Sequence, residues 1–223
     1  MFFKEEVVTN GRVILLDEPL SENERRAVCE LETADGQEIV LLEDIRLATE
    51  LEKILEPLAA PGTLFVFPGN GANFPRRFSS ICQRALCVSV HAKRFWVPGE
   101  DPEVSVGLIC PECFLLLGIK NVVVVDDVIS SGRTMRDLYK KNAWRIPGAR
   151  WRTCAWVSQL LPSGGSIRGY HDVSTACLVR KVKGTQKVPI NSLSTLRKNP
   201  EIATSYARRH FREPEEFLRI LGH

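Results

Sequence analysis

The chain has 223 residues, of which 44% are hydrophobic and 26% charged, and its formal net charge is +3. These values are ordinary for a soluble globular protein and exclude a fibrous or a wholly disordered chain. No apolar run reaches the roughly 18–20 residues of a membrane span, and charges at residues 4–6 interrupt the stretch that a signal peptide keeps apolar. We therefore expect a cytoplasmic protein without a membrane partner.

The seven cysteines are expected to be free thiols, because no export signal accompanies them. Cys110 and Cys113 form a C-x-x-C pair, but a structural zinc site usually takes four ligands from two such pairs. Cys82 and Cys87 are spaced differently, and the four histidines show no paired spacing. Two thiols are therefore favoured over zinc at Cys110 and Cys113, and both alternatives stay open.

Residues 1–42 predict two β-hairpins. Asn10-Gly11 lies between the apolar runs of VVTNGRVILL, and Asp35-Gly36 lies inside AVCELETADGQEIVLL. Both dipeptides favour the two-residue turn that joins antiparallel strands. We expect this segment to form a small antiparallel sheet outside the main core.

From residue 43 to about 160, helical and strand patterns alternate. The segments are a helix in LLEDIRLATELEKILEPLA, a strand at Thr63–Phe67, a helix in PRRFSSICQRAL opened by Pro75, a strand in CVSVHA, a short apolar helix in CFLLLGI, a strand in NVVVVDD, a helix in SSGRTMRDLYKKN and a strand in ARWRTCAWVSQL. Such alternation predicts an α/β fold, a parallel sheet with helices on both faces.

Residues 161–223 predict one or two strands in SIRGYHDVSTACLVRKVKG, then a helix from about Pro200 to Phe211 and a last helix near Pro214–Leu221. The expected division is therefore a segment at 1–42, a core at 43–160 and an extension at 161–223.

The segment VVVVDDVISSGRT, residues 122–134, carries the chemistry. Asp126 and Asp127 end a valine strand, and open parallel sheets bind ligands beyond the carboxyl ends of their strands. Small residues then turn into a helix, whose exposed amides and dipole suit a phosphate. Gly132 lets the backbone approach that anion closely. The segment thus offers acids for hydroxyls or a metal beside an anion pocket, as a sugar phosphate requires.

Two other interpretations compete with this one. A valine strand ending in acids also fits a nucleotide triphosphatase, but that class requires G-x-x-x-x-G-K-[ST] upstream, which no glycine cluster here contains. A buried strand whose acids merely cap the next turn is the purely structural alternative. The SSGRT loop that follows favours binding over both.

The whole segment resembles the phosphoribosyl-diphosphate signature of the type I phosphoribosyltransferases. That signature has four apolar residues, two acids, two apolar residues, two small residues, glycine, any residue and threonine. The resemblance covers about residues 51–160. It implies that Asp126 and Asp127 hold the ribose 2- and 3-hydroxyls, and that the 5-phosphate lies in the loop Ser130, Ser131, Gly132, Arg133 and Thr134.

The same resemblance implies further site residues. The loop after the first core strand would bind diphosphate through its amides, and comprises Gly69, Asn70, Gly71 and Ala72. Lys93 and Arg94 would meet the diphosphate oxygens. Residues 95–107 stand where the family has a catalytic lid that excludes water, although the acids in this stretch are unusual beside a diphosphate.

The implied activity transfers ribose 5-phosphate from phosphoribosyl diphosphate to a nitrogen of a nucleobase or related heterocycle. Asp126, Asp127, Lys93 and Arg94 are the implied catalytic residues, with Mg²⁺ held directly or indirectly by the acid pair. A hood from residues 1–42, with part of 164–190, would grip the base. Its identity stays open, although Ser130 replaces the third acid of the enzymes for 6-oxopurines. A homodimer is expected.

A phosphoribosyl-diphosphate sensor of the same fold is the alternative. It would regulate nucleic acid or a partner without catalysis. The basic excess after residue 148 favours it slightly. The overall charge of +3 is too mild to indicate nucleic-acid binding by itself, so nucleic acid is not the favoured partner.

Overall fold

The structure is a computed structural model that describes residues 2–69, 71–95, 103–109, 118–159, 173–182 and 187–223. The chain forms two compact units. The core unit comprises Met1–Glu6 and Leu47–Leu178, and the terminal unit comprises Val7–Arg46 and Val179–His223.

The core unit contains a six-stranded sheet in the order β1-β10-β9-β8-β4-β5. The strands are β1 (Phe2–Val8), β4 (Thr63–Pro68), β5 (Leu86–Val90), β8 (Asn121–Ile129), β9 (Arg150–Ser158) and β10 (Val173–Arg180). All pairings from β10 through β5 are parallel. The predicted α/β class with a parallel sheet is thus confirmed.

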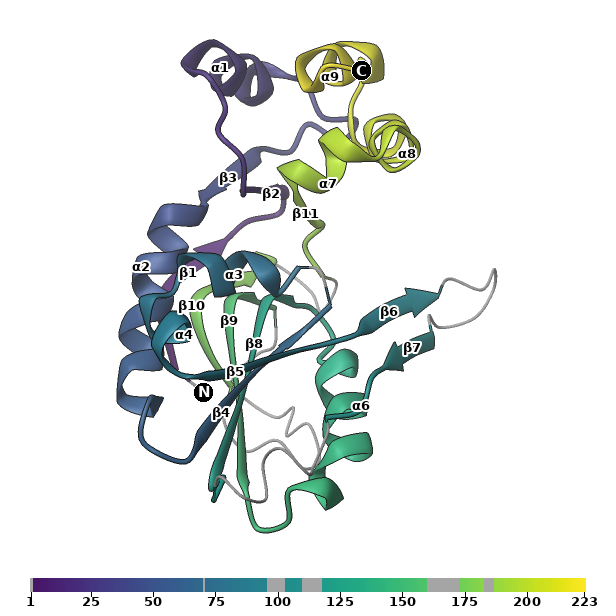
Figure 1. Cartoon of the computed structure of the whole chain (residues 1–223). Coiled ribbons are helices and arrows are strands. Elements are labelled where there is room, and N and C mark those ends of the chain that lie inside the picture. Colours follow the sequence, from purple (N-terminus) through teal and green to yellow (C-terminus); the bar gives the residue numbers. More distant parts are fainter. Residues whose placement is uncertain (1, 70, 96–102, 110–117, 160–172, 183–186) are drawn as a thin grey trace. The chain divides into compact units, whose positions relative to one another are not determined.

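Helices cover both faces of this sheet (Figure 1). They are α2 (Asp44–Leu55), α3 (Asn73–Phe78) and α4 (Ser80–Arg84) on one face and α6 (Arg133–Asn142) on the other, with short 3-10 turns η1 (Glu56–Leu58) and η2 (Ala143–Arg145). PRRFSSICQRAL is two helices rather than the one predicted, because Ser79 is extended and its hydroxyl accepts the Cys82 amide, which caps α4.

Alternate residues of the valine strand β8 point to opposite faces of the core sheet. Val122 and Val124 are buried in one cluster with Met135 and Leu138 of α6. On the other face, the ring of Trp156 lies 5.8 Å from that of Phe78 in α3, centroid to centroid. Strands covered on both faces are apolar throughout, which explains the run of four valines.

An antiparallel ribbon leaves the sheet after β5. It consists of β6 (Ala92–Phe95) and β7 (Glu103–Val106). The expectation of a loop over 95–107 is therefore wrong for β7, which pairs with β6 along its length. Residues 96–102 lie outside the described residues, so the lid stays a prediction.

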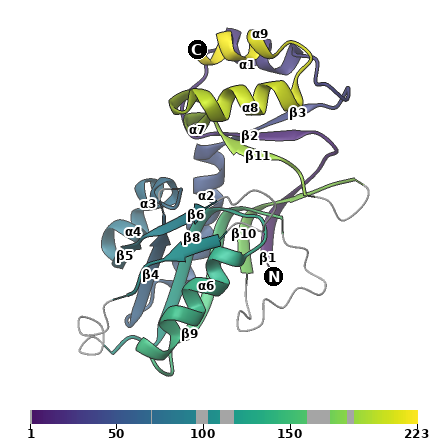
Figure 2. The same ribbon diagram turned by 90° about the vertical axis from the view of Figure 1, so that its right-hand side faces the viewer.

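The terminal unit contains a second parallel sheet in the order β11-β2-β3, made of β11 (Ile190–Ser192), β2 (Arg12–Leu16) and β3 (Ile39–Glu43). Figure 2 shows one of its faces covered by α1 (Glu22–Glu30), α7 (Leu193–Lys198), α8 (Pro200–His210) and α9 (Pro214–Leu221). The two last helices agree with the prediction. Among the residues described, no helix is both long and apolar enough to cross a membrane.

The predicted hairpins of residues 1–42 are wrong. β1 joins the sheet of the core unit, whereas β2 pairs in parallel with β3 and β11. AVCELE belongs largely to the helix α1 instead of a strand. Ser21 and Glu24 form a capping box at its start, since the Ser21 hydroxyl accepts the Glu24 amide and the Ser21 amide donates to the Glu24 carboxylate at 2.7 Å.

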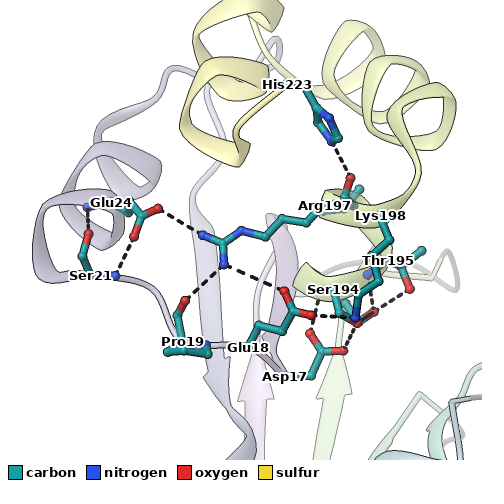
Figure 3. A network of polar contacts seen from close by, with 12 residues as sticks. Asp17, Glu18, Pro19, Ser21, Glu24, Ser194, Thr195, Arg197, Lys198 and His223 are labelled. Carbon is teal, nitrogen blue, oxygen red and sulfur yellow. Dashed lines mark hydrogen bonds and ion pairs between the residues drawn. The ribbon is translucent and has the colours of Figure 1, made fainter.

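Opposite charges join the two chain segments of the terminal unit. Residues 7–46 hold ten acidic and four basic side chains, and residues 179–223 hold ten basic and four acidic ones. Figure 3 shows Arg197 reaching Glu24 at 3.0 Å and Glu18 at 3.9 Å, beside Lys198 on Glu18 at 2.7 Å. Three basic residues of the C-terminal half, Arg197, Lys198 and Arg212, therefore pair with acids of residues 7–46.

Candidate functional site

The candidate site lies where the strand order of the core sheet reverses. β5 follows β4 in the chain and lies on one side of it, whereas β8 lies on the other side. Ligands of open α/β sheets bind beyond the carboxyl ends of the strands at such a switch point. The pairing of β4 with β8 ends at Val66↔Val124, but β8 continues along β9 to Ile129↔Ser158. The acid pair therefore stands beyond the last pair with β4.

The two acids are held by the backbone of their own strand. Asp126 is 7% exposed and Asp127 is half-buried. The amide of Asp127 donates to Oδ1 of Asp126 at 3.0 Å, and the amide of Val128 donates to Oδ1 of Asp127 at 2.8 Å. A carboxylate has about four acceptor positions, so Asp127 can accept further donors while this bond fixes its orientation.

The loop after β4 lies directly against Asp127. A Cβ placed on Gly71 would come within 2.6 Å of both Cγ and Oδ1 of that side chain, a distance that no real Cβ contact shows. Only glycine fits there, so the backbone of the loop passes close to the carboxylate. At the start of the loop the Gly69 amide donates to the Val90 carbonyl at 2.8 Å, and Ala72 is fully buried at its end. Asn70 lies outside the described residues.

The predicted anion loop turns into α6 as expected. Gly132 has φ 66° and ψ 11° at the N-cap, a left-handed conformation that favours glycine. Ser131 is exposed and Thr134 is buried. The first-turn amides of this ten-residue helix, at the positive end of its dipole, suit an anion. A small hollow is lined by Asp126 together with Ser130, Gly132, Arg133 and Thr134, so the structure brings acid and loop together.

Lys93 and Arg94 lie on β6, just after the carboxyl end of β5. Lys93 is opposite Ser105 and Arg94 is opposite Val104. Their predicted contact with diphosphate stays a prediction. The approach of Gly71 to Asp127 was missed, because it joins residues 56 positions apart and no local pattern signals it.

The described cysteines, at 29, 82, 87, 154 and 177, are free thiols. Cys110 and Cys113 lie outside the described residues, so the choice between thiols and zinc is not tested there. Within the described ranges, no group of three or more His, Cys, Asp or Glu side chains could hold a metal ion by itself.

No protein-family profile and no curated protein matches the chain. Several solved structures are similar in fold. A Neisseria gonorrhoeae protein with bound ppGpp has 16% identity and a TM-score of 0.48, covering 86% of this chain and 94% of its own. The xanthine-guanine-hypoxanthine phosphoribosyltransferase of Helicobacter pylori has 16% identity and a TM-score of 0.46, covering 69% and 93%. The purine phosphoribosyltransferase of Pyrococcus horikoshii has 16% identity and a TM-score of 0.39, and the match covers 64% of this chain and 90% of that one.

Two of these three structures are phosphoribosyltransferases, the family that the segment at 122–134 resembles. At 16% identity and TM-scores below 0.5, the likeness carries no argument about ligand or reaction.

Proposed function

We propose that this protein is a phosphoribosyltransferase. It would move the ribose 5-phosphate of phosphoribosyl diphosphate to a nitrogen of a nucleobase or related heterocycle, and release diphosphate. The observation that carries the proposal is the meeting of three features at one strand edge. Asp126 shares a small hollow with the anion loop, and the glycine loop after β4 lies against the neighbouring acid Asp127.

Each feature suits one part of the substrate. The turn at Gly132 and the first amides of α6 suit the 5-phosphate. The carboxylates of Asp126 and Asp127 accept hydrogen bonds, as ribose hydroxyls require. The loop at Gly71 would present backbone amides to the diphosphate. Lys93 and Arg94 would add positive charge to the leaving group as its own negative charge grows.

Magnesium fits the donors at this edge. Mg²⁺ prefers oxygen ligands and is usually bound by one or two carboxylates with waters and substrate oxygens. Asp126 and Asp127 would hold it, directly or through water. When bound, the ion would neutralise charge on the departing diphosphate. The protein would orient the ribose against the acceptor, so no nucleophilic side chain is required.

The alternative function, a sensor that binds nucleic acid, is not proposed. Its motive was the basic excess of the tail, and Arg197, Lys198 and Arg212 make ion pairs with acids of residues 7–46. A homodimer and the identity of the base stay predictions without support from the described contacts.

Calorimetric titration with phosphoribosyl diphosphate and Mg²⁺ tests the binding half of the proposal. Replacing both Asp126 and Asp127 by Asn should abolish binding with little change in fold, because the shape is kept while both charges are lost. Glu215→Gln with Glu216→Gln is the matched control, an adjacent acid pair at the start of α9. Equal affinity in the acid-pair variant and the control would refute the assignment.

Release of diphosphate tests the catalytic half. Purines, pyrimidines and other nitrogen heterocycles are offered one at a time with phosphoribosyl diphosphate and Mg²⁺. We expect release above the rate of hydrolysis with at least one acceptor, and none from the acid-pair variant. Tight binding without release for any acceptor would favour a sensor.

A further inference from the structure

The last residue of β7 and the three residues after it are fixed to α6 by packing and by hydrogen bonds. Val106 is 4% exposed and Ile109 is 0% exposed, and both belong to the buried cluster that contains Met135 and Leu138 of α6. Figure 1 shows the ribbon of β6 and β7 leaving the sheet beside this helix. We call residues 106–109 the ribbon stem.

Asn142, the last residue of α6, holds the stem through its side-chain amide. It is 0% exposed. Its Oδ1 accepts the amide of Ile109 at 2.6 Å, and its Nδ2 donates to the carbonyls of Gly107 at 3.3 Å and Leu138 at 2.9 Å. Burying an amide is unfavourable unless its donors and acceptor are satisfied, and here they are satisfied by backbone.

Neighbouring cations hold the same stem. Nζ of Lys141 donates to the carbonyl of Val106 at 3.3 Å, and Nη1 of Arg145 in η2 donates to the carbonyl of Ile109 at 3.5 Å. The end of α6 therefore supplies hydrogen-bond partners that backbone groups of this kind usually find in an adjacent strand.

The stem connects Asn142 to the cations of the ribbon. The amide of Gly107 donates to the carbonyl of His91 at 2.7 Å, two residues before Lys93. Lys93 is then held opposite Ser105 by the register of β6 and β7. At the other end of the helix, Gly132 forms the anion loop. One helix thus begins at the phosphate loop and ends at the anchor of the ribbon.

We infer that Asn142 is a positioning residue, which sets the separation between the anion loop and the ribbon that carries Lys93 and Arg94. The inference rests on the proposed function, because it needs a ligand that reaches both places. Under the proposed function, a pentose with a 5-phosphate and a 1-diphosphate would be that ligand. A nucleoside 5′-monophosphate needs only the anion loop, so the two ligands separate positioning from general stability.

Two variants and a solvent-exposed asparagine as control test the role. Asn142→Asp keeps the acceptor for Ile109 but removes both donors, and Asn142→Leu removes all three bonds. Asn199 is the control residue, because its Nδ2 donates to the carbonyl of Thr195 at 2.9 Å, also four residues earlier, in the terminal unit. Its variants are Asn199→Asp and Asn199→Leu.

Calorimetry with phosphoribosyl diphosphate plus Mg²⁺, and separately with adenosine 5′-monophosphate, gives the readout. In Asn142→Asp we expect affinity for phosphoribosyl diphosphate to fall about tenfold or more, because two buried hydrogen bonds, to the carbonyls of Gly107 and Leu138, are lost. Affinity for the monophosphate should change less than twofold, and the Asn199 variants should match wild type for both ligands. Amide hydrogen exchange at Ile109 should become faster in Asn142→Leu and stay unchanged in Asn199→Leu.

Other outcomes would overturn the inference. An equal loss of affinity for both ligands would mean that Asn142 has only a structural role. Unchanged affinity for both ligands would mean that Asn142 has no role in binding. If Asn142→Leu does not fold, Lys141→Met tests the same stem without a buried cavity. Wild-type protein that binds neither ligand would refute the proposed function and with it the positioning role. Amide exchange at Ile109 would then still decide whether Asn142 anchors the stem.

Discussion

Replacing Gly71 by alanine adds one methyl group at the most crowded point of the site. Its carbon would lie 2.6 Å from both Cγ and Oδ1 of Asp127. Non-bonded heavy atoms need about 3.5 Å, so the loop or the carboxylate must move by about 1 Å. The backbone of β8 cannot easily shift to relieve this clash, because β8 is paired with β9 on both sides of Asp127, at Asp126↔Ala155 and Val128↔Val157.

The expected loss follows from the hydrogen bonds of Asp127. Rotating its carboxylate breaks the bond from the Val128 amide, which is 2.8 Å long. A shift of about 1 Å also takes a bond to a ribose hydroxyl beyond hydrogen-bonding range. A bond to a charged group contributes about 1.5–3 kcal/mol, so affinity for phosphoribosyl diphosphate should fall by about 10- to 150-fold. Overpacking should lower the free energy of unfolding by about 1–3 kcal/mol.

Gly148→Ala is the control for the loss of stability. Gly148 has φ +78° and no atom within 4 Å of its would-be Cβ, so alanine there brings backbone strain alone. That strain should lower the free energy of unfolding by about 1–2 kcal/mol and leave ligand affinity at the wild-type value. Calorimetry with phosphoribosyl diphosphate and Mg²⁺, beside urea unfolding, separates the two effects.

A double-mutant cycle identifies the contact itself. If Gly71→Ala acts by displacing the Asp127 carboxylate, it should weaken binding much less once Asp127 is already alanine. Full additivity would place the effect elsewhere in the loop. Wild-type affinity and wild-type stability in Gly71→Ala would refute the close approach of the loop to the acid.

Three further changes are expected to act as follows. Gly132→Val strains a left-handed turn and crowds the anion, so calorimetry should show affinity for adenosine 5′-monophosphate falling about a hundredfold, the effect of two lost charged hydrogen bonds; Gly148→Val should not do this. Burial, aided by the cations of Arg12 and Arg209, lowers the pKa of His210 to about 4. Protonation therefore disfavours the folded state, and stability present above about pH 6.5 is lost as the pH falls toward the folded pKa. His210→Phe keeps a ring against Tyr206, and in urea unfolding it should reduce the stability lost between about pH 7 and about pH 4 by about 1–2 kcal/mol after allowance for solvent screening. An equal loss in the variant and in wild type would count against this account. Arg197→Glu places a third negative charge beside Glu18 and Glu24 and should lower the free energy of unfolding by about 1–2 kcal/mol, less at high salt. Arg212→Glu, at a more exposed pair, should change it by less than about 1 kcal/mol.

The core strands could be predicted because their signals are local. The valine run at 122–125 is long, apolar and followed by a turn glycine, and β8 and α6 lie where these residues predict them. The helices α8 and α9 each begin at a proline and were placed correctly for the same reason. The acid pair and the anion loop share one continuous segment, so their proximity also followed from the sequence.

The terminal unit could not be predicted, because its pairings join distant segments. Asn10-Gly11 has the composition of a hairpin turn, yet Gly11 is required for another reason: a Cβ there would collide with the carbonyl of Glu38. The amide of Arg12 donates to that carbonyl at 3.0 Å. Gly36 does turn the chain, with φ +67°, but it lies between a helix and a strand. The capping box of Ser21 and Glu24 was the local signal that could have identified α1.

The terminal unit has a consequence for how the chain folds. Its two halves are separated in sequence by the core, and β2 cannot gain β11 as a neighbour until residues 190–192 have been synthesised. Closing so long a loop is entropically unfavourable for a flexible chain. A folded core removes most of that cost, because it fixes the three points at which the chain passes between the units, Glu6, Leu47 and Leu178, and so raises the effective concentration of each half for the other. Until the basic half has been synthesised, residues 7–46 carry an excess of six negative charges. Repulsion between these charges disfavours association of this segment with other copies of itself. Folding of the core should therefore precede folding of the terminal unit, and a destabilised core should lower the stability of both halves of the terminal unit together.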